Sequence, residues 1–109
     1  MRVFFPKFNR DEVAAKIREY AAELREKLGL EKVVLFGSYA KGTYTAASDI
    51  DLLIVFDDEK SSEGTVYRTL MKNIKLPRME LHLIPKSELP SYEGTRWMRL
   101  VEREGIRIL

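Results

Sequence analysis

The chain has 109 residues, 45% of them hydrophobic and 33% charged, a size that predicts one domain spanning residues 1–109. Its 19 basic and 17 acidic residues leave a net charge of +2, which argues against direct nucleic-acid binding. The sequence contains no cysteine and no apolar run near the roughly 20 residues of a membrane span, which favours a reducing, cytoplasmic compartment and argues against a membrane protein.

Hydrophobic periodicity predicts an alternation of helices and strands. Residues 1–8 are apolar and aromatic, and they fit either an edge strand or an arm on a partner. Asn9 and Glu12 resemble a capping box and Gly29 resembles a helix stop, so a helix is expected between them. The further expected elements are strands at 32–36 and 49–56, a helix at 62–74, a strand at 78–84, a turn at 88–89, a helix at 95–104 and a strand at 106–109.

This order of elements predicts a mixed α/β domain in which helices flank a mixed β-sheet. The connection between the first two long strands is short, which predicts that they pair antiparallel. A helix separates the second strand from the third, and this helix allows a parallel crossover.

Two short motifs flank the connection between the first two strands. Gly37 ends the first strand, and Ser38 is placed to cap a helical turn at 39–41. Asp49 and Asp51 open the second strand, where positions two apart point to the same face. Neighbouring carboxylates repel each other unless a cation lies between them, and Mg²⁺ is usually held by carboxylates together with substrate phosphates. The turn supplies backbone N–H groups and a hydroxyl that could hold phosphate.

A third acid, Glu80, lies on the strand at 78–84 and shares a face with His82. Taken singly, a Gly-Ser pair is usually only a turn, and Asp-x-Asp is often a solvated loop end. Together they place charge on one face of apolar strands, which is costly unless a cation or a partner compensates it. The combination therefore favours a metal and phosphate site over two unrelated surface features.

The pattern Gly37-Ser38, ten residues, then Asp49-x-Asp51 resembles the signature of the DNA polymerase β-like nucleotidyltransferase superfamily, and the stretches 35–42 and 48–55 resemble its minimal nucleotidyltransferase group. The resemblance implies the nucleotidyltransferase fold, with two Mg²⁺ ions and ATP as substrate. It implies that Gly37 and Ser38 bind the β- and γ-phosphates. It further implies that Asp49, Asp51 and Glu80 are the metal ligands and the catalytic residues. The family usually has Asp where this chain has Glu80, which leaves open whether Glu80 completes the metal site.

Other side chains near these motifs have two interpretations each. His82 could support a metal ligand or contact the acceptor, although a partly exposed strand histidine is the simpler interpretation. Lys41 could reach a phosphate or be solvated. Tyr39 and Tyr44 could stack on a base or pack against the sheet, and Arg78 could neutralise phosphate charge.

The resemblance also implies an activity and a partner. Minimal nucleotidyltransferases are commonly paired with a small helical HEPN-domain protein. In such a toxin–antitoxin pair, the nucleotidyltransferase is the antitoxin and attaches AMP to a Tyr hydroxyl of the HEPN toxin. Two alternatives stay open at this point: an inactive module of the same fold that neutralises its partner by binding, and a transferase that modifies a small molecule such as an aminoglycoside antibiotic.

Overall fold

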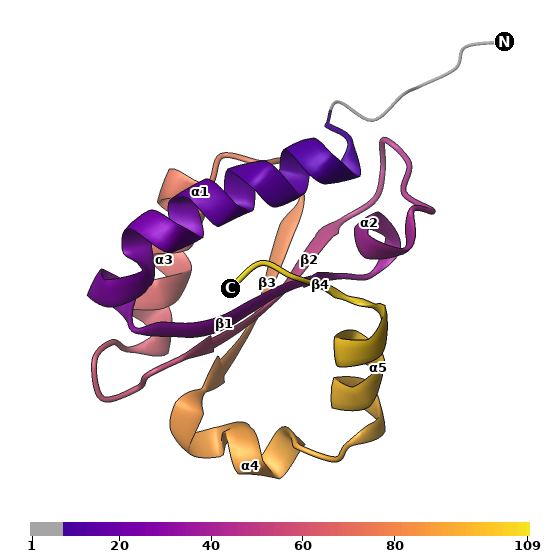
Figure 1. The fold of residues 1–109 in the computed structure, drawn as a ribbon. Coiled ribbons are helices and arrows are strands. Elements are labelled where there is room, and N and C mark those ends of the chain that lie inside the picture. The colour runs from indigo at the N-terminus through magenta and orange to yellow at the C-terminus, as the bar shows by residue number, and fades with distance from the viewer. Residues whose placement is uncertain (1–7) are drawn as a thin grey trace, which may run out of the picture.

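The fold is a four-stranded mixed sheet with helices on both faces (Figure 1). The computed structural model describes residues 8–109, so the strand or arm expected at 1–8 lies outside the described residues except for Phe8. In chain order the elements are α1 (Arg10–Leu28), β1 (Leu30–Phe36), α2 (Ser38–Lys41), β2 (Ile50–Phe56), α3 (Glu63–Asn73), β3 (Met79–Pro85), the 3₁₀ helix η1 (Lys86–Glu88), α4 (Leu89–Tyr92), α5 (Arg96–Glu104) and β4 (Ile106–Arg107). Between residues 8 and 109, no helix has the length and apolar character needed to cross a membrane.

The strands lie in the order β3-β2-β1-β4. β1 pairs antiparallel with β2 and β4, which confirms the predicted pairing of the first two strands, and β2 pairs parallel with β3 by the crossover that the intervening helix allowed. The register places Phe36 opposite Asp51 and Asp51 beside Glu80. The end of β1 and the beginnings of β2 and β3 therefore meet at one end of the sheet.

Alternation along the strands builds a separate core on each face of the sheet. α1 and α3 cover one face, and α5 covers the other (Figure 1). In β2, Leu52 and Ile54 pack with the residues of α1 and α3, whereas Leu53 and Val55 pack with those of α5. Asp51, two residues before Leu53, therefore lies on the α5 side of the sheet.

Side-chain caps fix where the main helices begin and end. Asn9 Oδ1 accepts a hydrogen bond of 2.8 Å from the N–H of Glu12, as the predicted capping box requires. Ser62 and Thr95 cap α3 and α5 in the same way. Gly29 ends α1 with a φ of 70°, a left-handed conformation that glycine adopts without strain. These boundaries confirm the predictions for the three long helices to within a residue or two.

Two local predictions are wrong. Ser38 does not cap α2: it is the first residue of the helix, Gly37 occupies the cap position, and no side-chain cap bond forms. The reason is that the chain turns at Gly37, one residue earlier than the motif suggested. The turn expected at 88–89 is instead the junction of η1 and α4. Pro90 continues into α4 because the first turn of a helix does not need its N–H group.

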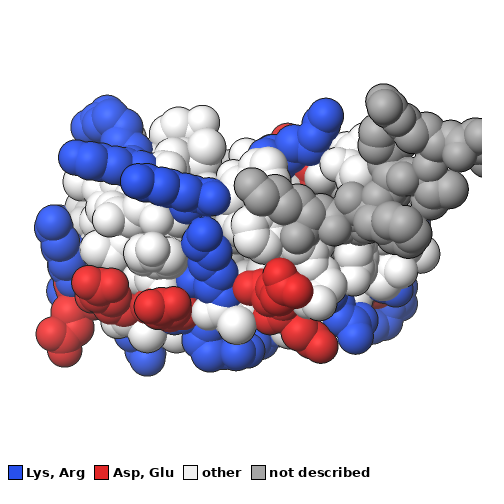
Figure 2. All heavy atoms as spheres, turned by 90° about the horizontal axis from the view of Figure 1, so that it is seen from above, with Lys and Arg blue, Asp and Glu red and all other residues white. Residues whose placement is uncertain are grey.

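Charges of both signs occupy the surface. On the side of the molecule that α1 covers, basic and acidic side chains are both present (Figure 2). Ion pairs join Lys32 to Glu102, and Lys86 to Glu31 at 3.1 Å. Such exposed pairs typically contribute about 0–1 kcal/mol each, so the two apolar cores are the main source of stability.

Candidate metal and nucleotide site

The Gly37 turn lies directly against Asp51. Gly37 has φ 75° and ψ −153°, a region that is essentially open only to glycine. A Cβ atom at this position would lie 2.5 Å from Asp51 Oδ2. Because Phe36 pairs with Asp51 across β1 and β2, the sheet holds the turn and the carboxylate side by side. The structure thus joins the turn of the first motif to one aspartate of the second.

Asp51, Glu80 and His82 form a compact cluster. Each side chain offers one ligand atom, and these three atoms all lie within 4.8 Å of one another. The parallel register of β2 and β3 brings Asp51 beside Glu80, and His82 follows two residues later on the same face. Metal–ligand bonds of about 2.1 Å separate opposite ligand atoms on one ion by up to roughly 4.2 Å. The cluster is therefore close to the size that one divalent cation requires.

The ring of His82 is held between aromatic neighbours. Its centroid lies 5.1 Å from that of Phe36 and 6.0 Å from that of Trp97. The side chain is 33% exposed, as the simpler interpretation expected, yet its Nε2 atom lies only 3.5 Å from Asp51 Oδ1. Nε2 is buried and has no hydrogen-bond partner among residues 8–109. Leaving such an atom unpaired typically costs about 1–3 kcal/mol, so a partner at this position would be favourable.

The other predicted site residues lie near this cluster in the chain but outside it. Asp49 is exposed and precedes β2 by one residue, and it is not part of the group formed by Asp51, Glu80 and His82. Ser38 is half-buried and follows Gly37 directly at the start of α2. The assignment of Asp49 to the metal and of Ser38 to the nucleotide stays a prediction.

Three of the remaining candidates, Tyr39, Tyr44 and Lys41, have structural partners. Tyr39 and Tyr44 stack on each other, with ring centroids 4.4 Å apart and an interplanar angle of 6°. Burial, with a smaller contribution from Tyr44, raises the pKa of Tyr39. Lys41 Nζ lies 3.2 Å from a carboxylate oxygen of Glu104. The packing interpretation of the two tyrosines is therefore favoured over base stacking.

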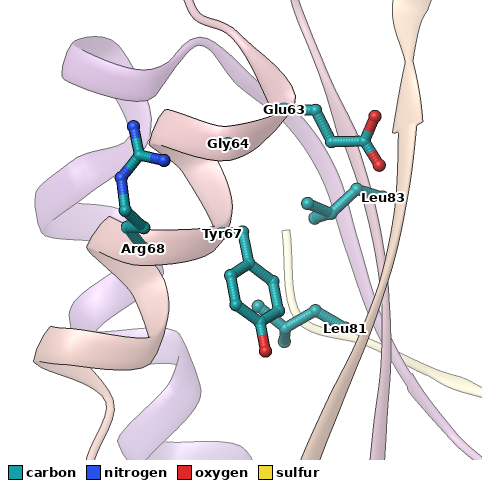
Figure 3. Close-up of a pocket in the computed structure, with 6 residues that line it drawn as sticks. All are labelled: Glu63, Gly64, Tyr67, Arg68, Leu81 and Leu83. Atoms are coloured by element: carbon teal, nitrogen blue, oxygen red, sulfur yellow. The ribbon is translucent and has the colours of Figure 1, made fainter.

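Two hollows flank β3 on opposite faces of the sheet. One, of about 480 Å³, lies between α3 and β3, and Tyr67 reaches over Leu81 there while Arg68 points away (Figure 3). Because Leu81 alternates with Glu80 and His82, this hollow is on the far side of the strand from the cluster. The other, of about 420 Å³, borders the cluster through His82 and is lined by His82, Leu83, Ile84, Tyr92 and Trp97. Sequence reasoning missed Tyr92 and Trp97, because nothing in their spacing indicated that α4 and α5 face the cluster.

The residues present fit a divalent cation. Two carboxylates supply hard oxygen donors and negative charge. Glycine at position 37 leaves Asp51 room that any side chain would fill. Nε2 of His82, which has no hydrogen-bond partner in the described part of the chain, lies at the same cluster. The cluster could therefore hold a metal ion next to the turn that was predicted to hold phosphate.

Comparison with known proteins gives matches over most of the chain. Residues 17–105 match the nucleotidyltransferase domain family. A Methanocaldococcus jannaschii protein, named as a candidate protein adenylyltransferase, is 30% identical over 79 residues, which are 72% of this chain and 79% of that protein. The protein adenylyltransferase MntA of Thermococcus cleftensis is 30% identical over 88 residues, covering 74% of this chain and 81% of its own.

A solved structure supports the same fold. The crystal structure of a candidate nucleotidyltransferase from Sulfolobus solfataricus superimposes with a TM-score of 0.53 at 22% identity, covering 90% of this chain and 80% of its own. Its identity is low, so this likeness concerns the fold alone. The predicted mixed α/β fold is thereby confirmed. From the family match and the relatives together, the chain belongs to the nucleotidyltransferase family and is a nucleotidyltransferase enzyme.

Proposed function

We propose that this enzyme transfers AMP from ATP to a tyrosine hydroxyl of a partner protein. The hydroxyl oxygen forms a bond to the α-phosphorus of ATP, and the bond from that phosphorus to the bridging oxygen breaks. Pyrophosphate leaves with the bridging oxygen, and the hydroxyl proton passes to solvent. Two relatives named as protein adenylyltransferases support AMP as the transferred group and a protein as the acceptor.

The observation that carries this proposal is the contact of the Gly37 turn with Asp51, beside Glu80. Transfer at phosphorus depends mainly on positioning and on neutralising charge. In the proposed site, Gly37 and Ser38 hold the β- and γ-phosphates, while Asp51, Glu80 and Asp49 hold Mg²⁺. When bound, two Mg²⁺ ions would neutralise the phosphates and orient the attacking and leaving oxygens. The sheet register supports this site, because it places the end of β1, which leads into the Gly37 turn, beside Asp51, and Asp51 beside Glu80.

The acceptor in this proposal is a tyrosine of a HEPN-domain toxin, and the transfer makes this chain a cytoplasmic antitoxin. The hollow beside His82 supports an aromatic acceptor, since Tyr92 and Trp97 line it and their ring centroids lie 6.3 Å apart. Aromatic side chains pack favourably in offset or edge-to-face arrangements at such distances. A tyrosine side chain in the hollow would lie next to the metal cluster.

Labelled ATP tests this function. The chain is incubated with labelled ATP, Mg²⁺ and the product of its neighbouring gene, and label on that product is measured. Wild-type enzyme should label a single tyrosine, and Asp51→Asn should lower the rate by about 100-fold or more, the loss typical of one electrostatic group at a reacting centre. Glu19→Gln, an exposed carboxylate of α1 on the other face of the sheet, serves as the matched control and should keep full activity.

Two results would overturn the proposal. Equal labelling by wild type and Asp51→Asn would show that the cluster of Asp51, Glu80 and His82 takes no part in the transfer. Tight binding of the partner without any label would instead identify a module that neutralises its partner by binding alone.

A further inference from the structure

We propose that His82 is a protein ligand of the metal at Asp51 and Glu80, and that its imidazole makes this site select a first-row transition ion, such as Mn²⁺, over Mg²⁺. The inference rests on the metal site of the proposed function, but it does not depend on the transfer of AMP. Metal binding can be measured without nucleotide or acceptor.

His82 lies next to both carboxylates of the cluster. Nε2 of His82 lies 3.5 Å from Asp51 Oδ1, and the cluster of ligand atoms that includes Glu80 spans no more than 4.8 Å. An ion bound by Asp51 and Glu80 would therefore lie within reach of Nε2. The strand alternation that brings Glu80 to this face brings His82 to it as well.

The imidazole of His82 is buried at Nε2 and packed between aromatic rings. Nε2 is shielded from solvent and lacks a hydrogen-bond partner within the described part of the chain. Phe36 and Trp97 hold the ring from neighbouring positions, with their own rings meeting edge to face at 5.9 Å. A ring fixed in this way loses little freedom when it binds an ion. A metal ion binds Nε2 through the lone pair of that nitrogen, so the single ring proton must lie on Nδ1.

Asp51, Glu80 and His82 offer a mixed set of oxygen and nitrogen donors. Mg²⁺ prefers oxygen ligands in a near-ideal octahedron and gives up its water reluctantly. Imidazole binds Co²⁺ and Zn²⁺ better, and the affinity of a nitrogen-containing site rises along the first transition row, in which Mn²⁺ is the weakest binder. Two carboxylates with one imidazole thus form a mixed oxygen and nitrogen site, which favours a transition ion while still admitting Mg²⁺ at higher concentration.

The composition of the chain makes a direct test possible. His82 is the only histidine in the sequence, so any histidine nitrogen on a bound metal must come from it. Protein prepared without a polyhistidine tag is loaded with Mn²⁺ and studied by pulsed electron paramagnetic resonance. The expected result is a nitrogen hyperfine coupling from imidazole in the wild type and its loss in His82→Gln.

Trp97 is the only tryptophan, and its fluorescence should be quenched when Co²⁺ binds beside His82.

Competition gives the selectivity. Mn²⁺ should displace Mg²⁺ from the wild type at a concentration at least about tenfold lower than that of Mg²⁺. His82→Gln should weaken Mn²⁺ binding by about tenfold or more and leave Mg²⁺ binding almost unchanged, while Glu19→Gln should change neither.

The outcomes separate this inference from the proposed function. Mn²⁺ binding without a nitrogen coupling in the wild type would overturn the role of His82, whether or not the variant folds. Absence of Mn²⁺ binding would overturn the metal site itself. A nitrogen coupling in a protein that transfers no AMP would support the ligand and contradict only the transfer.

Discussion

At the scale of single residues, Asp51 is the centre of the site. Its Oδ2 atom lies against the backbone of Gly37, and its Oδ1 atom faces His82. Glu80 lies beside it in the sheet register. One carboxylate therefore connects the turn that is proposed to bind phosphate with the groups that are proposed to bind metal.

Replacement of Gly37 tests this connection. Gly37→Ala forces alanine into a strained backbone region at a cost of about 1–3 kcal/mol, and it drives a Cβ into Asp51. We expect a lower free energy of unfolding in urea and the loss of AMP transfer. Gly94→Ala is the matched control, because Gly94 also has a positive φ, of 80°, but a Cβ there would meet no atom of residues 8–109 within 4 Å. Equal activity of both variants would contradict the role given to Gly37.

The sequence predicted the members of this site better than their arrangement. Gly37, Asp51 and Glu80 were singled out from motif spacing and strand alternation, and the structure brings them together. Asp49 was expected to share the site from its spacing and from the resemblance; the strand begins one residue after it, and its role as a metal ligand stays a prediction. The position of His82 against Asp51 depends on the parallel register of β2 and β3, whose paired residues, such as Ile50 and Met79, are 29 positions apart in the sequence (79 − 50). Local patterns do not determine such a register.

At the scale of elements, a small hydrogen-bonded link joins the segments that follow β2 and β3. The hydroxyl and the N–H group of Ser87 both donate to the carboxylate of Asp58. These bonds lower the pKa of Asp58 below its ordinary range. The link fixes the ends of the parallel strand pair that lie away from the metal cluster.

The link predicts a specific pH dependence. Because the pKa of Asp58 is lowered in the folded protein, its contribution to stability is present above the ordinary pKa of an aspartate, about 3.9, and is lost as the pH falls through the folded value. Ser87→Ala removes the hydroxyl bond, so the Asp58 pKa should rise toward its ordinary value in an NMR titration. The stability difference between wild type and Ser87→Ala should be largest near neutral pH and shrink in acid. A difference that is constant with pH would contradict this link, and Ser91→Ala, an exposed serine of α4, serves as the control.

The elements also show where the sequence was insufficient. The three long helices carry clear caps at Asn9, Ser62 and Thr95, and they were predicted to within two residues. The segment 86–92 has no apolar periodicity long enough to indicate a helix, and Pro90 suggested a break. Its two short helices form where β3 ends and the chain turns toward α5, which is a consequence of tertiary structure.

At the scale of the whole molecule, stability depends on two cores that share the strands of one sheet. Leu53 is fully buried in the core beneath α5, whereas Leu100 on α5 is 40% exposed. Leu53→Ala should lower the free energy of unfolding by about 2–5 kcal/mol, a large share of the roughly 5–15 kcal/mol of a typical domain. Leu100→Ala makes the same chemical change at the surface and should cost less than about 1 kcal/mol. Urea denaturation compares the two, and similar losses would contradict the description of this core.

The fold class followed from the order of elements, because a short connection and a helical crossover leave few ways to pair three strands. The position of β4 in the sheet could not be predicted from the sequence, since a strand of two residues shows almost no hydrophobic pattern. It pairs with β1 and completes the edge of the sheet. The face on which α5 packs, and with it the aromatic side of the site, depends on that pairing.

Calorimetric titration of ATP tests the central claim most directly, which is that the Gly37 turn and the Asp51 carboxylate form one nucleotide and metal site. We predict that ATP binds the wild type in the presence of Mg²⁺ or Mn²⁺. The affinity should fall by about tenfold or more without the metal and in Asp51→Asn, as expected for the loss of a charged interaction, and it should not change in Glu19→Gln. Binding of ATP that is the same in wild type and Asp51→Asn, with or without metal, would contradict the account.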